Sequence, residues 1–172
     1  MGNRFVALDP SSLNVGWAVF QGDGLVAWGN ISAGKIDFDR RFMFLTEQLS
    51  IVARQYNPQE IAAEETKFRW KGREIASLRV AYLSIRKWAE RSKIPWTQYN
   101  VATWKASVLG DNHAGKEQTE ATIRMIYPRL PAGLSEHEID AIAVGIYHAG
   151  VRRLETMAGG PITSEKKKRG KK

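Results

Sequence analysis

Short apolar runs separated by turn residues fill the first part of the chain, a pattern typical of β-strands. The runs cover 4–9, 15–20 and 25–31, and residues 21–24 between the last two read QGDG. A glycine-rich turn with Asp-Gly between two β-prone runs is a strong hairpin signal. The pattern predicts three antiparallel strands at the start of the chain.

The period then changes to that of a helix. Apolar residues recur every three or four positions over 42–56, and Pro58 ends the pattern. Residues 60–64 (EIAAE) form a short apolar run that ends in an acid, which predicts a buried strand. A second helix is expected over 72–91 and a fifth short strand over 95–99.

Further helical patterns cover 101–109, 116–127 and 135–154. The resulting order of elements is β-β-β-α-β-α-β-α-α-α. This order predicts an α/β domain in which helices cover both faces of a five-stranded mixed sheet.

The helix expected over 72–91 carries a narrow apolar stripe whose members follow one another at intervals of three and four. The members are Ile75, Leu78, Tyr82, Ile85 and Ala89. Such spacing suits packing against another helix. The stripe fits either packing within its own subunit or the interface of a dimer.

Composition limits the class of protein. A chain of 172 residues fits one domain with a single core. No run approaches the ~18 consecutive apolar residues of a membrane span, and no secretion signal is recognisable. Cysteine is absent, which excludes disulfides and thiolate metal sites. Any metal must therefore be bound by carboxylates, histidines and water.

The net charge of +8 is concentrated near the C-terminus, where residues 161–172 carry six basic residues and one Glu. We expect a domain over 1–158 followed by a basic tail over 159–172. Such a tail can bind DNA phosphates without reading sequence. The alternative is a solvated tail without a binding role.

A second basic cluster lies between the fourth strand and the second helix. Its members are Phe68, Arg69, Trp70, Lys71 and Arg73. Basic side chains with interleaved aromatic rings are typical of a nucleic-acid surface, although an ordinary charged helix face looks similar. We interpret the cluster as a DNA-binding segment.

Two acids end strands that are expected to be neighbours. Asp9 closes the first strand and Glu64 the fourth. Ligands of open α/β sheets bind at the carboxyl ends of strands, so the two acids should converge. Carboxylates are the ligands that Mg²⁺ and Mn²⁺ prefer, and two such ions about 3.5–4 Å apart can clamp a phosphodiester.

The last predicted helix offers a third acid. Ser135 and Glu138 have the spacing of a capping box. Asp140 lies at the edge of the apolar face, where a partly buried acid needs a partner. His137 and Glu136 lie on the same side of the helix, and spacing alone does not choose between them.

These residues resemble, in order, the RuvC family of Holliday-junction resolvases. Residues 7–10 (ALDP) with Gly16-Trp17 resemble the opening strand of that family. Residues 61–65 (IAAEE) resemble the strand that carries its second acid, and residues 140–143 (DAIA) resemble its final helix. The resemblance covers nearly the whole chain before the tail.

The resemblance implies an RNase H-like fold and a homodimer with two active sites that nick opposing strands of a junction. It implies that Mg²⁺ or Mn²⁺, expected as two ions per active site, is bound by Asp9, Glu64, His137 and Asp140. The predicted function is a structure-selective endonuclease that resolves four-way DNA junctions by paired, metal-dependent phosphodiester hydrolysis.

The resemblance also suggests further site residues. Lys105 and Lys116 fall where the family uses lysines, and both are predicted to contact the scissile phosphate. Phe68 is nearest to the family's aromatic residue that stacks on junction bases. It follows Glu64 by four residues, one more than in some relatives, so Glu65 remains an alternative ligand.

Two other functions fit the same pattern. One is an RNase H-like nuclease acting on RNA, as in the YqgF-type branch, and the other is a non-catalytic nucleic-acid-binding module. Retention of all four predicted metal-site residues argues against the second. We expect the protein in the cytoplasm of a bacterial or phage-infected cell, associated with the nucleoid.

Overall fold

The structure is a computed structural model that describes residues 3–66 and 73–161. Within these ranges the strands are β1 (Arg4–Pro10), β2 (Asn14–Gln21), β3 (Gly24–Ser32), β4 (Glu60–Glu64) and β5 (Trp96–Tyr99). The helices are α1 (Phe38–Tyr56), α2 (Arg73–Arg91), α3 (Val101–Leu109), α4 (Lys116–Ile126) and α5 (Glu136–Ala158). The predicted order of elements is confirmed.

The strands form a five-stranded mixed sheet in the order β3-β2-β1-β4-β5. β2 pairs antiparallel with both β1 and β3. β4 runs parallel to β1, and β5 runs parallel to β4. At the predicted hairpin, Gly22 has a φ of 59°, which glycine adopts without steric cost. β1 therefore lies in the middle of the sheet, beside β4.

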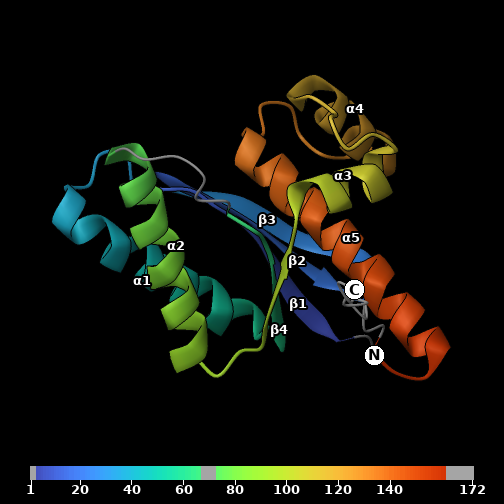
Figure 1. The fold of residues 1–172 in the computed structure, drawn as a ribbon, viewed down its shortest axis with the longest axis horizontal. Coiled ribbons are helices and arrows are strands. Elements are labelled where there is room, and N and C mark those ends of the chain that lie inside the picture. The colour runs from blue at the N-terminus through green and yellow to red at the C-terminus, as the bar shows by residue number, and fades with distance from the viewer. Residues whose placement is uncertain (1–2, 67–72, 162–172) are drawn as a thin grey trace, which may run out of the picture.

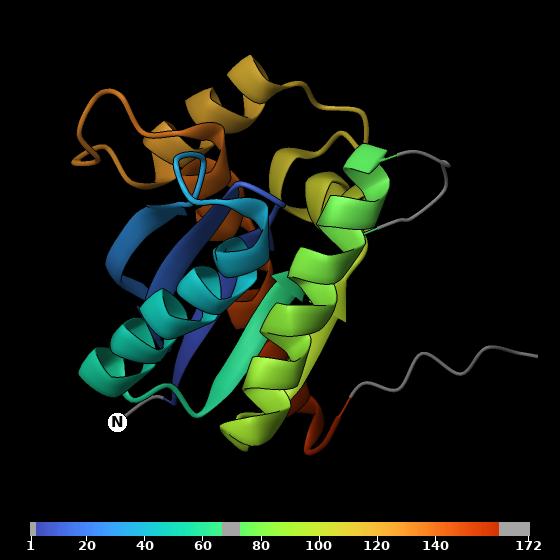
Figure 2. The same cartoon turned by 90° about the vertical axis from the view of Figure 1, so that its left-hand side faces the viewer.

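Each face of the sheet has its own apolar core, because successive side chains of a strand point to opposite faces. Val6 and Leu8 of β1 join the core formed with α1 and α2, whereas Phe5 and Ala7 join the core formed with α3, α4 and α5. Figure 1 shows α5 crossing one face, and Figure 2 shows α1 and α2 covering the other. Helices thus cover both faces, as predicted.

Two helices extend beyond their predicted limits. α1 begins at Phe38, earlier than predicted. The prediction missed this first turn because it is mostly polar, and the apolar spacing starts only at Phe42. α5 continues to Ala158, and Gly159 ends it with a φ of 74°. The predicted tail starts there, and its residues 162–172 lie outside the described part of the chain.

The apolar stripe of α2 is used inside the subunit. Tyr82, Ile85 and Ala89 are buried, and α2 packs against α1, β1 and β5. The side chain of Ile75 lies outside the described residues. Leu78 is half-buried. The buried members of the stripe therefore serve packing within the subunit. None of the described helices is long and apolar enough to cross a membrane.

Candidate active site

Two of the predicted acids lie side by side at one edge of the sheet. Asp9 lies near the end of β1 and is 8% exposed, and Glu64 is the last residue of β4. The parallel register pairs Leu8 with Ala63, so the acids that follow them occupy neighbouring positions. The expected convergence of Asp9 and Glu64 therefore follows from strand register.

The start of α5 brings two more predicted residues to this edge. Ser135 caps the helix, and the side chain of Glu138 accepts a hydrogen bond from the Ser135 backbone N–H at 2.8 Å, which confirms the capping box. His137 and Asp140 follow in the first turns. His137 Nδ1 lies 2.6 Å from Asp9 Oδ2, joining residues 128 positions apart in the sequence.

Gly16 permits this close approach between α5 and the sheet. It is the β2 partner of Asp9 in the antiparallel register. A Cβ atom at position 16 would lie 1.8 Å from the carbonyl oxygen of His137, a distance that no pair of non-bonded atoms tolerates. Because glycine lacks that atom, the first turn of α5 lies directly against β2.

Asp9, Glu64 and Asp140 form an acid cluster. Burial raises the pKa of Glu64 to about 8, with repulsion from Asp9 and Asp140 adding to the effect. Burial and repulsion from Asp9 likewise raise the pKa of Asp140 to about 6. The pKa of His137 is raised by its hydrogen bond with Asp9. The fold therefore forces negative charges together where solvation is poor.

The two alternatives left open by the sequence have other partners. Glu65 Oε2 accepts a hydrogen bond from Asn100 Nδ2 at 3.1 Å. Glu136 forms an ion pair with Lys116 near the surface, and its side chain is 45% exposed. The structure thus directs Glu64 and His137, in place of these neighbours, towards Asp9.

The donor set suits a divalent cation in its chemistry. The acid cluster supplies hard oxygen atoms, and His137 supplies an imidazole nitrogen. A cation would also relieve the repulsion that raises the pKa values of Glu64 and Asp140. Within 3–66 and 73–161, however, no three acids or histidines already converge on one ion position. The ligand set therefore remains a prediction.

Comparison with known proteins identifies the relatives of this arrangement. The family described as "Crossover junction endodeoxyribonuclease RuvC" matches residues 5–148. This chain belongs to the RuvC family. Proteins with the same description include one from Beijerinckia indica, 31% identical over 87% of this chain and 88% of that protein. A second, from the Wolbachia of Brugia malayi, is 28% identical over 84% of this chain and 93% of that protein.

Solved structures agree with the RuvC assignment. The Thermus thermophilus RuvC structure has a TM-score of 0.73 at 21% identity and covers 88% of this chain and 96% of its own. T. thermophilus RuvC in complex with Holliday junction substrate has a TM-score of 0.77 at 21% identity, over 90% of this chain and 97% of that one. The predicted fold, family and endonuclease class are confirmed.

The two predicted lysines differ in their relation to the acid cluster of this RuvC member. Lys105 Nζ donates a hydrogen bond to the Ala114 carbonyl oxygen at 2.7 Å, and its charge counteracts the raised pKa values of Glu64 and Asp140. Lys116 has a side chain that is 81% exposed and pairs with Glu136. Lys105 thus lies near the acids, and Lys116 lies at the rim.

The predicted DNA-binding segment cannot be compared with the structure. Phe68, Arg69, Trp70 and Lys71 lie outside the described residues. Arg73 is the first residue of α2, but its side chain is also outside the described set. Their assignment to DNA binding remains a prediction of the sequence.

Sequence reasoning missed one contact in the site. Trp104 Nε1 donates a hydrogen bond to Glu64 Oε2 at 3.0 Å, and Trp104 is fully buried. The available signal was an aromatic residue beside the candidate Lys105, inside a predicted helix. That signal is weak, because buried aromatic residues in helices serve packing far more often than chemistry.

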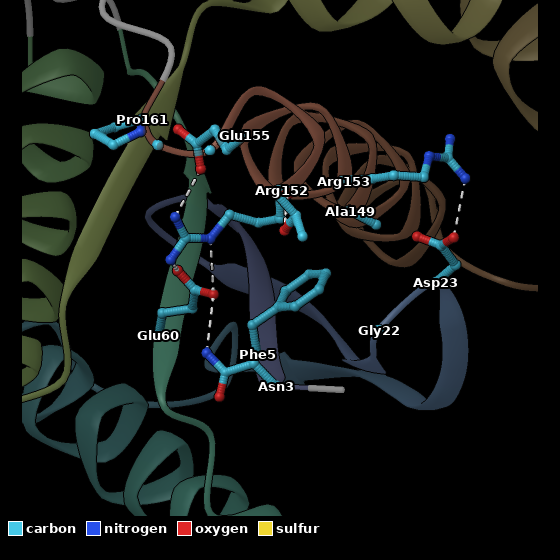
Figure 3. A pocket seen from close by; sticks show the side chains of 13 residues that line it. Asn3, Phe5, Gly22, Asp23, Glu60, Ala149, Arg152, Arg153, Glu155 and Pro161 are labelled. Atoms are coloured by element: carbon cyan, nitrogen blue, oxygen red, sulfur yellow. Dashed lines mark hydrogen bonds and ion pairs between the residues drawn. The ribbon is translucent and has the colours of Figure 1, made fainter. Parts of the chain in front are cut away.

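A second buried acid, Glu60, lies at the other end of β4, beside a cavity of about 690 Å³. Arg152 Nη2 lies 2.6 Å from Glu60 Oε2, and Asn3 Nδ2 donates to Oε1 at 3.3 Å (Figure 3). His148 Nε2 lies 3.5 Å from Oε2 without a hydrogen bond between them. Burial raises the pKa of Glu60, but His148 and Arg152 outweigh it and lower the pKa to about 2.

Proposed function

We propose that this protein resolves four-way DNA junctions by divalent-metal-dependent hydrolysis of phosphodiester bonds. The observation that carries the proposal is the acid cluster, in which β1, β4 and α5 bring Asp9, Glu64 and Asp140 together under mutual repulsion. Family membership supports the choice of DNA crossover junctions as the substrate. With this substrate, we expect the protein to act at the nucleoid, in the cytoplasm of a bacterial or phage-infected cell.

In this proposal the acid cluster and His137 hold Mg²⁺ or Mn²⁺, two ions per site. Bound metal supplies an activated water molecule and stabilises the charge on the scissile phosphate. The protein contributes the orientation of its carboxylates. In this proposal His137 donates the proton on Nδ1 to Asp9 Oδ2, 2.6 Å away. This hydrogen bond fixes the orientation of the imidazole ring.

Lys105 and Lys116 supply positive charge for the DNA phosphates in this proposal. Lys105 is close enough to affect the pKa values of Glu64 and Asp140, so its ammonium group is suited to contact the scissile phosphate. Lys116 begins α4 at the exposed rim, where Glu136 holds it. We assign it an approach contact with the DNA backbone.

DNA binding away from the cut rests on two sequence segments. Phe68, Arg69, Trp70, Lys71 and Arg73 follow Glu64 closely in the chain and combine aromatic and basic character. Such residues suit unstacked bases and phosphates at a junction centre. The basic tail over 159–172 adds contacts that are independent of sequence.

A homodimer accounts for paired cutting, because opposing strands of a four-way junction are related by symmetry. α2 packs through one side and exposes Val80 (42%) and Leu83 (53%) on another. Two neighbouring apolar side chains on an exposed helix face offer a contact for a second copy of α2. We therefore propose a dimer that places one active site on each of two opposing strands.

A cleavage assay with matched substrates tests the proposal. A four-way DNA junction, a linear duplex of the same sequences and a structured RNA are each incubated with Mg²⁺, with Mn²⁺ or with chelator. Paired nicks that are confined to the junction and need metal are the expected result. Cleavage of the RNA alone would indicate an RNA nuclease, and junction binding without cleavage would indicate a non-catalytic module.

A further inference from the structure

The N-cap and first turn of α3 contact Glu64, the last residue of β4, and Glu65, which follows it. Asn100 Oδ1 caps the helix by accepting from Ala102 N at 3.0 Å, while Asn100 Nδ2 donates to Glu65 Oε2 at 3.1 Å. One turn later, Trp104 Nε1 donates to Glu64 Oε2 at 3.0 Å. The start of α3 therefore binds two consecutive carboxylates, Glu65 and Glu64, through two different donors.

The Trp104 indole contributes more than packing. Its side chain is fully buried in the core formed with α3, α4 and α5, where another large apolar residue would also fill space. The indole N–H adds a single directed donor, which needs an acceptor once it is buried. Glu64, a member of the acid cluster, provides that acceptor.

A hydrogen bond of this kind fixes a carboxylate that would otherwise turn. The last torsion of a glutamate has a broad preference, so the plane of its carboxylate is poorly defined by the chain itself. Trp104 holds Oε2 and leaves Oε1 as the oxygen not engaged by the indole. Groups that bind metal ligands from behind commonly set ligand orientation in this way.

We propose that Trp104 is a positioning residue whose indole N–H orients the Glu64 carboxylate to receive a divalent cation. This inference rests on the proposed function, because it takes Glu64 as a metal ligand. Trp104 itself contacts neither the metal nor the DNA in this proposal. It acts through Glu64 alone.

Trp88 provides a matched control. Its Nε1 donates to Ser50 Oγ at 2.8 Å, linking α2 to α1, and it is 9% exposed. Trp104→Phe and Trp88→Phe each remove one buried indole N–H and keep a large aromatic ring. Only the first substitution removes a hydrogen bond from the acid cluster.

The first experiment measures Mn²⁺ binding to the DNA-free protein by calorimetry. Trp104→Phe should weaken binding about 10-fold, the lower end of the effect of losing a group that orients a metal ligand. Trp88→Phe should bind as the wild type does. Equal affinities for the two variants would overturn the proposal. In junction cleavage, the Mg²⁺ concentration at half-maximal rate should rise for Trp104→Phe by the same factor.

A second measurement does not depend on the folding of Trp104→Phe or on nuclease activity. The indole N–H resonance of Trp104 is assigned in the ¹⁵N-labelled wild type by triple-resonance spectroscopy. It should move upfield on addition of Mg²⁺ and in Glu64→Gln, while the Trp88 resonance stays in place. If the Trp104 resonance moves in neither case, the proposal is wrong. If it moves but no junction is cut, the proposed function fails and the positioning role remains.

Discussion

β4 carries one acid at each end, Glu60 buried and Glu64 half-buried, and the pKa values of the two are shifted in opposite directions. The pKa of Glu60 is lowered to about 2 and that of Glu64 is raised to about 8. Burial raises both values, since it removes water from the charged form. The difference comes from the neighbours: Glu60 faces Arg152 and His148, whereas Glu64 faces two further carboxylates.

This comparison distinguishes two uses of an acid that is shielded from water. Glu60 belongs to a network in which the chain itself supplies the compensating cation, Arg152. The acid cluster around Glu64 gathers negative charge that Lys105 and His137, among the described residues, offset in part. Perturbed titration of this second kind is typical of functional sites. Burial alone would not have separated the two acids.

The largest effect should follow from removing charge at the Glu64 end. Asp9→Asn and Glu64→Gln should each lower junction cleavage on the order of 1,000-fold or more, because both remove a proposed metal ligand. Binding of the uncut junction should persist, since the DNA-binding segment is unchanged. Single-turnover cleavage in Mg²⁺ and gel shifts in chelator measure the two properties separately.

Glu60→Gln is the matched control for these variants, because it removes a buried acid from the same strand. It should cut the junction as the wild type does, at a temperature where it is folded. Cleavage by Asp9→Asn or Glu64→Gln at the wild-type rate would show that the proposed active site is wrong.

The second effect concerns stability at the Glu60 end. Glu60→Gln should lower the free energy of unfolding by about 2–3 kcal/mol at pH 7, because it removes the buried anion that pairs with Arg152. The folded pKa of about 2 lies below the ordinary value of 4.5. The contribution is therefore present above pH 4.5 and is lost as the pH falls towards 2. Urea unfolding of the wild type and of Glu60→Gln across this pH range measures whether the difference between their free energies of unfolding disappears.

Arg152 allows a check on that interpretation. Arg152 also pairs with Glu155 at 2.8 Å, an i,i+3 pair that should contribute less than about 1 kcal/mol. Glu155→Gln should therefore cost much less stability than Glu60→Gln. If the two variants lose equal stability, the assignment of the stabilising charge pair to Glu60 is incorrect.

The smallest effect should have the opposite sign. In metal-free protein, Glu64→Gln should raise the free energy of unfolding by about 1–2 kcal/mol at pH 8. The folded pKa of Glu64 lies above 4.5, so the wild type loses stability as the pH rises from 4.5 to about 8. The gain should vanish near pH 4.5. Thermal melts with chelator at several pH values measure it.

Magnesium should make the wild type more stable than Glu64→Gln, the reverse of the order expected without metal. A ligand that binds only the folded state stabilises it, and the effect grows with concentration. Mg²⁺ should therefore raise the melting temperature of the wild type and leave that of Glu64→Gln unchanged. A similar rise in both proteins would place the bound ion away from Glu64.

Much of the fold could be predicted from the sequence because its signals are local. The hairpin at Gly22, the capping box at Ser135 and the apolar periods each depend on residues within a few positions. The convergence of Asp9 and Glu64 followed from the rule that parallel strands end at the same edge of a sheet. His137 was assigned by resemblance, since helix spacing left Glu136 equally placed.

The contacts that escaped prediction join distant segments. Trp104 reaches Glu64 across 40 residues, and Arg152 reaches Glu60 across 92. Neither pair follows from propensity or spacing, because each depends on how helices rest on the sheet. Glu60 and Glu64 therefore look alike in sequence, as acids at the two ends of one apolar run, and only their tertiary neighbours separate them.

The position of α5 has a consequence for the newly made protein. Translation produces Asp9 and Glu64 long before it produces His137 and Asp140, which arrive only with α5. A nascent chain on the ribosome therefore carries two of the three acids of the cluster and lacks the rest of the proposed active site. The same holds for any fragment that ends before α5, whether from interrupted translation or from proteolysis. We therefore expect such incomplete copies to be unable to cut DNA.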